Sequence, residues 1–218
     1  MNSISKKRFV VEIGKLLIKL SRVEDPEKLF EEFISSDSTS EDVRDERIPY
    51  WSELWPSAVG LSEYIAEHPN LIKGKRVVEI GCGLGLPGIV AGRLGGKVVL
   101  TDYLKPALKF AADNWKLNIK SPPETSILDW RSPGDFPPAD VLLASDVAYE
   151  SRAFTPLLKA MKMLVVKNGI VLLSEPNRKH TSKFLDSLKD EFSMTKSTKT
   201  VQANDVKNKI SVYHLTRK

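Results

Sequence analysis

The residues with the clearest chemical potential form a glycine-rich segment near the middle of the chain. Residues 77–88 read VVEIGCGLGLPG, so a run of apolar residues with Glu79 inside it leads into Gly81, Gly83 and Gly85. Glycines in such a turn can adopt positive φ angles and let a ligand lie directly against the backbone. The segment therefore predicts a buried strand, a ligand-binding turn and a helix, in that order.

Two glycine spacings in this segment point to different cofactors. Gly83, Gly85 and Gly88 fit the G-x-G-x-x-G pattern of dinucleotide-binding proteins. Gly81, Gly83 and Gly85 fit a tighter G-x-G-x-G pattern, which we prefer because a binding turn should begin where its strand ends. Asp102 closes the next apolar run, where a carboxylate can accept two hydrogen bonds from a ribose diol. That contact serves a nicotinamide dinucleotide and an adenosine cofactor equally well.

Composition predicts one soluble globular domain with a modest extension. The chain has 218 residues, of which 41% are hydrophobic and 28% charged, and no uncharged apolar run is long enough for a membrane helix. Cys82 is the only cysteine, which excludes an intrachain disulfide and fits a reducing, cytoplasmic compartment. The net charge of +5 has its basic excess near the C-terminus, but no aromatic residues alternate with those lysines as nucleic-acid binding would favour.

Apolar periodicity predicts that strands and helices alternate from residue 57 onward. Strands are expected near residues 76–80, 97–101, 124–128, 139–145 and 169–174. Helices are expected near residues 57–68, 87–94, 105–117, 153–166 and 180–190. This alternation predicts a parallel sheet that is covered on both faces. Residues 192–201 and 209–216, joined by a short polar connection over 203–208, predict an antiparallel hairpin at the sheet edge.

The N-terminal part of the chain has a different pattern. Residues 8–23, rich in Val, Ile and Leu with a glycine in the middle, predict two short strands around a turn. A helix is predicted over 26–34, and the polar stretch 35–47 is predicted to be a mobile or ligand-ordered linker. We therefore divide the chain into an N-terminal hairpin, helix and linker, residues 1–47, and a main domain, residues 48–218.

Three motifs together resemble the class I, seven-strand S-adenosylmethionine-dependent methyltransferases: EIGCGLG at 79–85, TD at 101–102 and DW at 129–130. The resemblance spans about residues 48–216. It implies an α/β fold with a Rossmann-like, doubly wound, mostly parallel seven-stranded sheet in three layers and an antiparallel C-terminal hairpin. The cofactor that it implies is S-adenosylmethionine, in a domain of residues 48–218.

The resemblance also assigns cofactor-binding residues. Glu79 and the turn of Gly81, Cys82, Gly83 and Gly85 would face the methionine part of the cofactor, Asp102 would hold the ribose, and Asp129 and Trp130 would flank the adenine. A carboxylate can accept a hydrogen bond from the exocyclic amine, and an indole can pack on the purine. Trp130 could instead be an aromatic residue at the edge of the core.

Two further segments narrow the resemblance. PYWSELWPS at 49–57 resembles the Trp-Pro entry of the family-16 protein methyltransferases and of the lysine methyltransferases that act on electron-transfer flavoprotein. The position matching Trp55 contacts the cofactor in that group, although Trp51 and Trp55 could simply cover the end of the sheet. ASDVAYE at 144–150 resembles the group's D-x-x-Y motif, in which Asp146 and Tyr149 match.

That D-x-x-Y resemblance implies that Asp146 and Tyr149 are the catalytic residues and that Ser145 contacts the cofactor through its backbone. A lysine acceptor has a pKa of ~10.4 and must lose a proton before its lone pair can react. An anion and a phenol can orient the ammonium, while burial lowers its pKa. Asp146 could instead be the N-cap of a helix.

The resemblances predict the cofactor better than the acceptor. Glu175-Pro176-Asn177-Arg178 is similar to a segment of the flavoprotein-directed branch, but we assign Arg178 no catalytic role. LPGI at 86–89 and ASDV at 144–147 instead resemble a family-16 member that modifies arginine. We therefore predict methyl transfer to a protein side-chain nitrogen, first of all lysine. The alternatives are arginine, a small amine, RNA, or a non-catalytic interaction module with the same fold.

Several partners are predicted to be absent. The chain lacks the Asn/Asp-Pro-Pro-Tyr/Phe motif that base-modifying methyltransferases carry after the fourth strand, so nucleic acid is not the expected partner. The three histidines, His68, His180 and His214, do not have the spacing of metal ligands, and we expect no metal. We expect a monomer that acts on a protein and does not bind a membrane.

Overall fold

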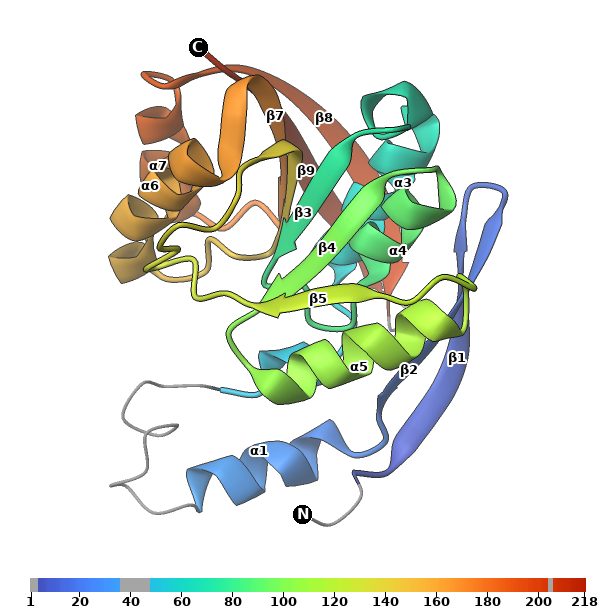
Figure 1. Cartoon of the computed structure of the whole chain (residues 1–218). Coiled ribbons are helices and arrows are strands. Elements are labelled where there is room, and N and C mark those ends of the chain that lie inside the picture. The colour runs from blue at the N-terminus through green and yellow to red at the C-terminus, as the bar shows by residue number, and fades with distance from the viewer. Residues whose placement is uncertain (1–3, 36–47, 204–205) are drawn as a thin grey trace.

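A computed structural model describes residues 4–35, 48–203 and 206–218. At its centre lies a seven-stranded sheet with the order β5-β4-β3-β6-β7-β9-β8 (Figure 1). The parallel strands are β3 (Arg76–Ile80), β4 (Lys97–Asp102), β5 (Glu124–Ile127), β6 (Ala139–Ser145) and β7 (Val165–Glu175). At one edge, β8 (Phe192–Ala203) and β9 (Val206–Arg217) form an antiparallel hairpin, with β9 also antiparallel to β7. The predicted sheet and its C-terminal hairpin are confirmed.

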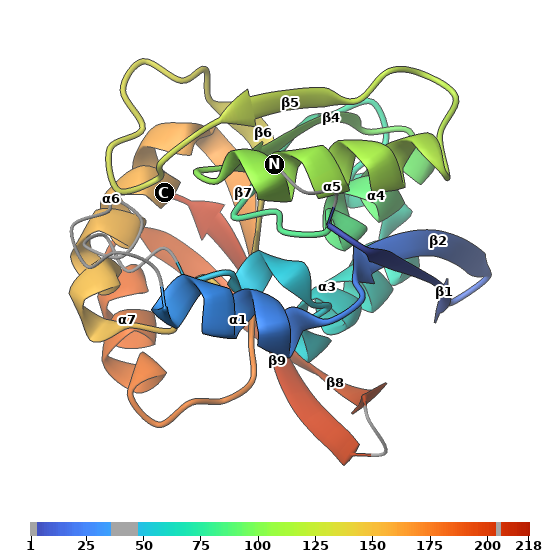
Figure 2. The same cartoon turned by 90° about the horizontal axis from the view of Figure 1, so that it is seen from below.

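Helices cover both faces of this sheet and complete the predicted three layers (Figures 1 and 2). One face carries α3 (Pro56–Glu67), α4 (Leu86–Arg93) and α5 (Lys105–Lys116), and the other carries α6 (Phe154–Leu164) and α7 (Thr181–Leu188). Successive strand residues point to opposite faces, so Val77 and Val78 enter different hydrophobic clusters. Within the described ranges, no helix combines the length and apolarity needed to cross a bilayer.

The order of the strands reverses beside β3. This strand pairs with β4 on one side and with β6 on the other, although the chain visits β4 and β5 before it returns to β6. In open parallel sheets the crevice at such a reversal lies at the carboxyl ends of the strands and is the usual ligand site. In Figure 1 the arrowheads of β3 and β4 point toward the side of the molecule where α1 lies. Residues that follow Ile80, Asp102 and Ser145 therefore meet at this side.

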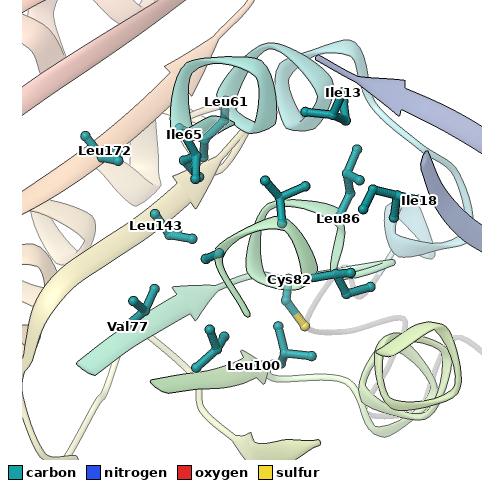
Figure 3. Close-up of a cluster of buried hydrophobic side chains, with 14 of the residues drawn as sticks. Ile13, Ile18, Leu61, Ile65, Val77, Cys82, Leu86, Leu100, Leu143 and Leu172 are labelled. Carbon is teal, nitrogen blue, oxygen red and sulfur yellow. The ribbon is translucent and has the colours of Figure 1, made fainter. Parts of the chain in front are cut away.

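The N-terminal residues form the predicted hairpin and helix. Strands β1 (Lys6–Ile13) and β2 (Leu16–Val23) pair in antiparallel fashion, and α1 (Pro26–Ile34) begins after Asp25, whose carboxylate accepts the Lys28 backbone N–H at 2.9 Å. Ile13 and Ile18 are fully buried against Leu61 of α3 and Leu86 of α4 (Figure 3). The hairpin thus shares the main hydrophobic core. Residues 36–47 of the predicted linker lie outside the described residues.

Two predicted boundaries are wrong. We expected the helix before β7 to reach residue 166 and the strand to begin near 169, but α6 ends at Leu164 and β7 begins at Val165. Val165 pairs with Ala139, and an irregularity then shifts the register before Ile170 pairs with Val141, so the strand absorbs the segment that the apolar pattern assigned to the helix.

The C-terminal hairpin is also longer than predicted. Ala203 pairs with Val206, so residues 206–208 belong to β9 and not to the connection; residues 204–205 lie outside the described part of the chain. Residues 206–208 are exposed or half-buried, so this end of the hairpin has no buried face to produce an alternation of apolar and polar residues in the sequence.

Candidate active site

A cavity of about 670 Å³ lies at the carboxyl ends of β3, β4 and β6. Its walls come from the glycine-rich turn, from the segments that follow β4, β5, β6 and β7, and from the stretch before α3. Every predicted site residue except Glu79 lines it, namely Trp55, Gly81, Cys82, Gly83, Gly85, Asp102, Asp129, Trp130, Ser145, Asp146 and Tyr149. The fold therefore brings together residues from five separate stretches of the sequence.

The turn after β3 needs glycine for two reasons. Gly81, Gly83 and Gly85 all have positive φ angles, of 59°, 50° and 80°. A side chain would also be crowded, since a Cβ on Gly81 would lie 3.1 Å from Cγ1 of Val147. The turn is closed by the Gly85 N–H, which donates to the Cys82 carbonyl at 2.7 Å. The result is a wall of bare backbone along the cavity, as the tighter glycine spacing predicts.

Asp102 stands beside this turn at the end of β4. Its Oδ2 accepts the Gly83 N–H at 3.1 Å, and its Oδ1 accepts the Leu104 N–H at 3.0 Å. Burial raises the pKa of Asp102 to about 6, although these backbone donors act in the opposite direction. Each carboxylate oxygen retains a lone pair beyond the bonds named here, so the group can still accept hydrogen bonds from a ligand in the cavity.

Glu79 lies behind the glycine turn. It is fully buried and is not among the residues that line the cavity, and its predicted contact with the methionine part of the cofactor stays a prediction. Its Oε2 accepts the Gly88 N–H of α4 at 2.9 Å, while Oε1 has no hydrogen-bond partner among the described residues. Burial raises the pKa of Glu79 to about 8, with the nearby Asp102 adding to the effect. The side chain of Glu79 holds the start of α4.

Asp129 and Trp130 follow β5 at the cavity wall. Trp130 is 9% exposed and packs in the hydrophobic cluster of the α6 and α7 face, so it is both a cavity residue and an edge-of-core aromatic. The Asp129 carboxylate is already engaged, because Arg131 Nε and Nη2 donate to it at 2.9 and 2.7 Å. The sequence prediction had not included Arg131, which also lines the cavity.

Asp146 is held in an unusual way at the end of β6. Its φ is +56°, and its N–H donates to the Ser174 carbonyl of β7 at 2.9 Å. Its carboxylate forms a close ion pair with the guanidinium of Arg178. The next helical turn is capped at Glu150, so Asp146 is not a helix N-cap. Left-handed backbone at a non-glycine residue is uncommon and concentrates at functional sites.

Arg178 is the main cavity residue to which the sequence analysis assigned no role. It lies three residues after β7, and β7 pairs with β6 so that Ser174 is opposite Ser145. This register brings the segments after the two strands together, and Arg178 lines the cavity beside Asp146. The backbone N–H of Arg178 donates to Glu175 Oε2 at 3.0 Å, which fixes the turn. Knowledge of the strand order and register would have identified the pair.

Tyr149 forms part of an aromatic cluster at the cavity mouth. Its ring lies 5.6 Å from that of Tyr50, whose ring lies 6.0 Å from that of Trp55, in edge-to-face geometry. The indole Nε1 of Trp55 donates to the Tyr50 carbonyl at 2.7 Å. Burial raises the pKa of Tyr149 to about 12, so its phenol keeps its proton at neutral pH. Trp51 is buried against Phe110 and also lines the cavity, which places it in the core as well.

Cys82 and Ser145 complete the predicted set. Cys82 is 5% exposed, and its side chain packs with Leu100 and Leu86 in the core (Figure 3). Burial raises the pKa of its thiol, which argues against a nucleophile. Ser145 is partly exposed at the cavity edge. No group of His, Cys, Asp and Glu side chains in the described ranges is arranged to hold a metal ion.

Comparison with known proteins decides the family. A family model described as lysine methyltransferase matches residues 42–191. The chain belongs to this lysine methyltransferase family. The protein N-lysine methyltransferase METTL21A of Danio rerio is 36% identical over 149 residues, which cover 65% of this chain and 68% of that protein. EEF1A lysine methyltransferase 3 of Xenopus tropicalis is 30% identical over 173 residues, covering 75% and 74%.

An arginine-directed relative is equally similar over a shorter stretch. The histone-arginine methyltransferase METTL23 of Rattus norvegicus is 36% identical over 129 residues, which cover 56% of this lysine methyltransferase family member and 56% of the rat protein. The match thus spans little more than half of the full length of this METTL23 relative. The names of these relatives all describe methyl transfer to proteins, and they differ in whether lysine or arginine is the acceptor.

Solved structures agree on the fold. Magnesium protoporphyrin IX methyltransferase from Synechocystis PCC 6803, crystallised with S-adenosylmethionine, has a TM-score of 0.59 at 17% identity and covers 89% of this chain and 98% of that one. The N-methyltransferase NodS from Bradyrhizobium japonicum has the same TM-score at 12% identity, covering 89% and 99%. The family is S-adenosylmethionine-dependent, so the predicted fold, family and cofactor are confirmed.

Proposed function

We propose that this protein transfers a methyl group from S-adenosylmethionine to a lysine side-chain nitrogen of another protein. One observation carries the proposal: a single cavity is lined both by the glycine turn with Asp102, here called the first side, and by Asp146 with Tyr149, here called the second side. Backbone and a buried carboxylate suit an adenosine cofactor, whereas a partly buried carboxylate and a phenol suit an amine. Membership of the lysine methyltransferase family supports the same assignment.

The residues of the first side fit the cofactor. Gly81, Gly83 and Gly85 leave space that side chains would fill, and a Cβ on Gly83 would lie 3.6 Å from the Trp51 backbone. Asp102 would accept the ribose hydroxyls, and Trp130 would pack on the adenine. When bound, S-adenosylmethionine supplies an electrophilic methyl group on a positively charged sulfur. Cys82, Trp55, Ser145 and Asp129 complete this proposed binding wall.

The residues of the second side would receive the acceptor. The Asp146 carboxylate attracts and orients a lysine ammonium, and the neutral phenol of Tyr149 offers a hydrogen bond without adding charge. Arg178 beside Asp146 contributes a positive charge that lowers the pKa of an incoming ammonium and so favours its deprotonation. The chain needs no strong base, because its main contribution is to hold the amine at near-attack distance.

A labelling experiment tests the proposal. The protein is incubated with methyl-labelled S-adenosylmethionine and a cell extract, and in parallel with purified elongation factor 1A and purified histones, the proteins named for its relatives. We expect protease-sensitive label that mass spectrometry assigns to lysine, and no label with the Asp102→Ala variant. Label lost only to nuclease would overturn the protein acceptor. Cofactor binding without any labelled product would favour a non-catalytic interaction module.

Arginine is the second candidate acceptor, because METTL23 of Rattus norvegicus matches at the same 36% identity as METTL21A of Danio rerio. The same labelled product distinguishes the two, since methylated lysine and methylated arginine differ in mass and in fragmentation. Methylarginine without methyllysine would replace lysine by arginine and leave the cofactor assignment intact. A labelled small amine in the absence of labelled protein would replace both.

We further propose that the protein acts as a cytoplasmic monomer on proteins and not on nucleic acids, with a main domain of residues 48–218. The support is the single buried, reduced Cys82, together with protein acceptors in the names of its relatives. Light scattering after gel filtration would test the monomer, and fractionation of cells that express the tagged chain would test the compartment.

A further inference from the structure

A buried asparagine connects the N-terminal hairpin to the glycine turn. Asn114 of α5 is fully buried, and its Oδ1 accepts the backbone N–H of Ser21 in β2 at 2.7 Å. Its Nδ2 donates to the Ser21 carbonyl at 3.1 Å and to the Leu84 carbonyl at 3.0 Å. The amide therefore uses its acceptor and both of its donors. One of the two peptide groups that it joins lies in the turn that lines the cavity.

A second asparagine repeats the hairpin contact without reaching the turn. Asn118 lies in the turn just after the end of α5, where Oδ1 accepts the Lys19 N–H at 2.8 Å. Its Nδ2 donates to the Lys19 carbonyl at 2.7 Å and to the Asn114 carbonyl at 2.8 Å. Their partners Lys19 and Ser21 are two residues apart on β2, so both peptide groups face the same edge of the strand. The asparagines thus give the free edge of β2 the bonds that a third strand would provide.

The hairpin also touches the back of the cavity wall through side chains. Val23 packs with Trp51 and Leu84, both of which line the cavity. Arg22 forms an ion pair with Glu53, another cavity residue, at 3.3 Å. No residue of the described stretch 4–35 lines the cavity itself. The hairpin can therefore affect a ligand only through the residues that it supports.

We propose that the N-terminal hairpin is a working part of the cofactor site and that Asn114 is a positioning residue for the glycine turn. The inference rests on the proposed function, because it requires S-adenosylmethionine to lie against that turn. The turn is fixed on both sides: Asp102 holds the N–H of Gly83, and Asn114 holds the carbonyl of the next residue, Leu84. Loss of the second contact leaves the Leu84 peptide group free to rotate away from its binding geometry.

A matched pair of variants tests this role. Asn114→Ala and Asn118→Ala each remove a two-point contact with β2, and only Asn114→Ala removes the bond to the turn. S-adenosylhomocysteine affinity is measured by calorimetry at a temperature where circular dichroism shows both variants folded. We expect about fivefold to tenfold weaker binding for Asn114→Ala, the effect of one buried hydrogen bond, and a change within about twofold for Asn118→Ala. Equal affinities of the two variants would overturn the positioning role.

Hydrogen exchange on the unmodified protein keeps the inference testable if Asn114→Ala does not fold. Coupling between two sites is reciprocal, so a ligand on the turn should stabilise the hairpin. We expect saturating S-adenosylhomocysteine to slow amide exchange in peptides that contain Lys19 and Ser21, and to leave the β8–β9 strands unchanged. Protection of the glycine turn without protection of β2 would overturn the inference alone. Absence of binding by the unmodified protein would overturn the proposed function as well.

Discussion

The glycine-rich side of the cavity and the side around Asp146 differ in what forms their walls. The first is built around the backbone of one continuous turn and around Asp102, which is 4% exposed and accepts hydrogen bonds from two backbone N–H groups. The second consists of long side chains from separate segments, held by ion pairs such as Arg178 with Asp146 and Arg152 with Glu150. One side is therefore fixed by backbone hydrogen bonds, and the other by contacts between charged side chains.

This difference explains how one family can keep its cofactor and vary its acceptor. Backbone geometry depends on glycines that no other residue replaces without strain, so the cofactor side is restricted. Exposed ion pairs such as Arg152 with Glu150 contribute little free energy individually, so their replacement leaves the fold intact. The relatives of this chain are named for lysine and for arginine. We infer that the acceptor is selected on the Asp146 side.

The largest expected effect separates the two sides directly. Asp102→Ala should weaken S-adenosylhomocysteine binding about 100-fold, because it removes charge-assisted hydrogen bonds to the ribose and leaves the Gly83 and Leu104 N–H groups unpaired. Asp146→Ala should change the same affinity less than about threefold. Calorimetry on both variants measures the difference. The opposite order would mean that the roles of the two sides are exchanged.

A smaller effect on methyl transfer should come from the other side. Asp146→Asn should lower kcat/KM for the labelled protein acceptor about 30-fold, since a neutral amide no longer attracts an ammonium. Its affinity for S-adenosylhomocysteine should stay unchanged. Arg178→Lys keeps a positive charge beside Asp146 and serves as the control, with an expected loss of about threefold. Steady-state kinetics with labelled cofactor measure kcat/KM for both variants. A loss of cofactor affinity in Asp146→Asn would contradict the division into a cofactor side and an acceptor side.

The buried carboxyl of Glu79, behind the glycine turn, should make the unfolding free energy of the protein depend on pH. Its pKa in the folded protein, about 8, lies above its ordinary value of 4.5, so the folded state binds more protons than the unfolded state between these pH values. Stability therefore falls as the pH rises through this range. Between pH 6 and pH 9 the unmodified protein should lose roughly 2 kcal/mol more unfolding free energy than Glu79→Gln. Urea unfolding across this range measures both; parallel curves would contradict the buried, protonated carboxyl.

The pH dependence of cofactor binding should show the smallest change. Asp102, with a pKa of about 6, is mostly protonated at pH 5 and ionised at pH 7, and the ionised form is the better acceptor for ribose hydroxyls. S-adenosylhomocysteine affinity should rise roughly tenfold from pH 5 to pH 7. Asp102→Asn should flatten this dependence. A dependence that persists in Asp102→Asn would assign the titration to another group.

Much of the cofactor side follows from local sequence. The strand, turn and helix around Gly81, Gly83 and Gly85, and the position of Asp102 after the next strand, depend on apolar periodicity and on glycine's conformational freedom. Both are properties of neighbouring residues, and the predicted boundaries hold within a few residues. The N-terminal hairpin was predicted for the same reason, because eight-residue strands around a glycine turn form a local pattern.

Contacts between distant segments were not predictable in this way. Arg178 meets Asp146 only because β7 pairs with β6 in one register, and Asn114 reaches Leu84 only because α5 packs beside the glycine turn. The side chain of Glu79 points to the face of the sheet that α4 covers, where it accepts the Gly88 N–H. Alternate residues of β3 point to opposite faces, and which helix covers each face depends on the tertiary structure. Such pairings depend on strand order and packing, for which a linear pattern of residue types carries no signal.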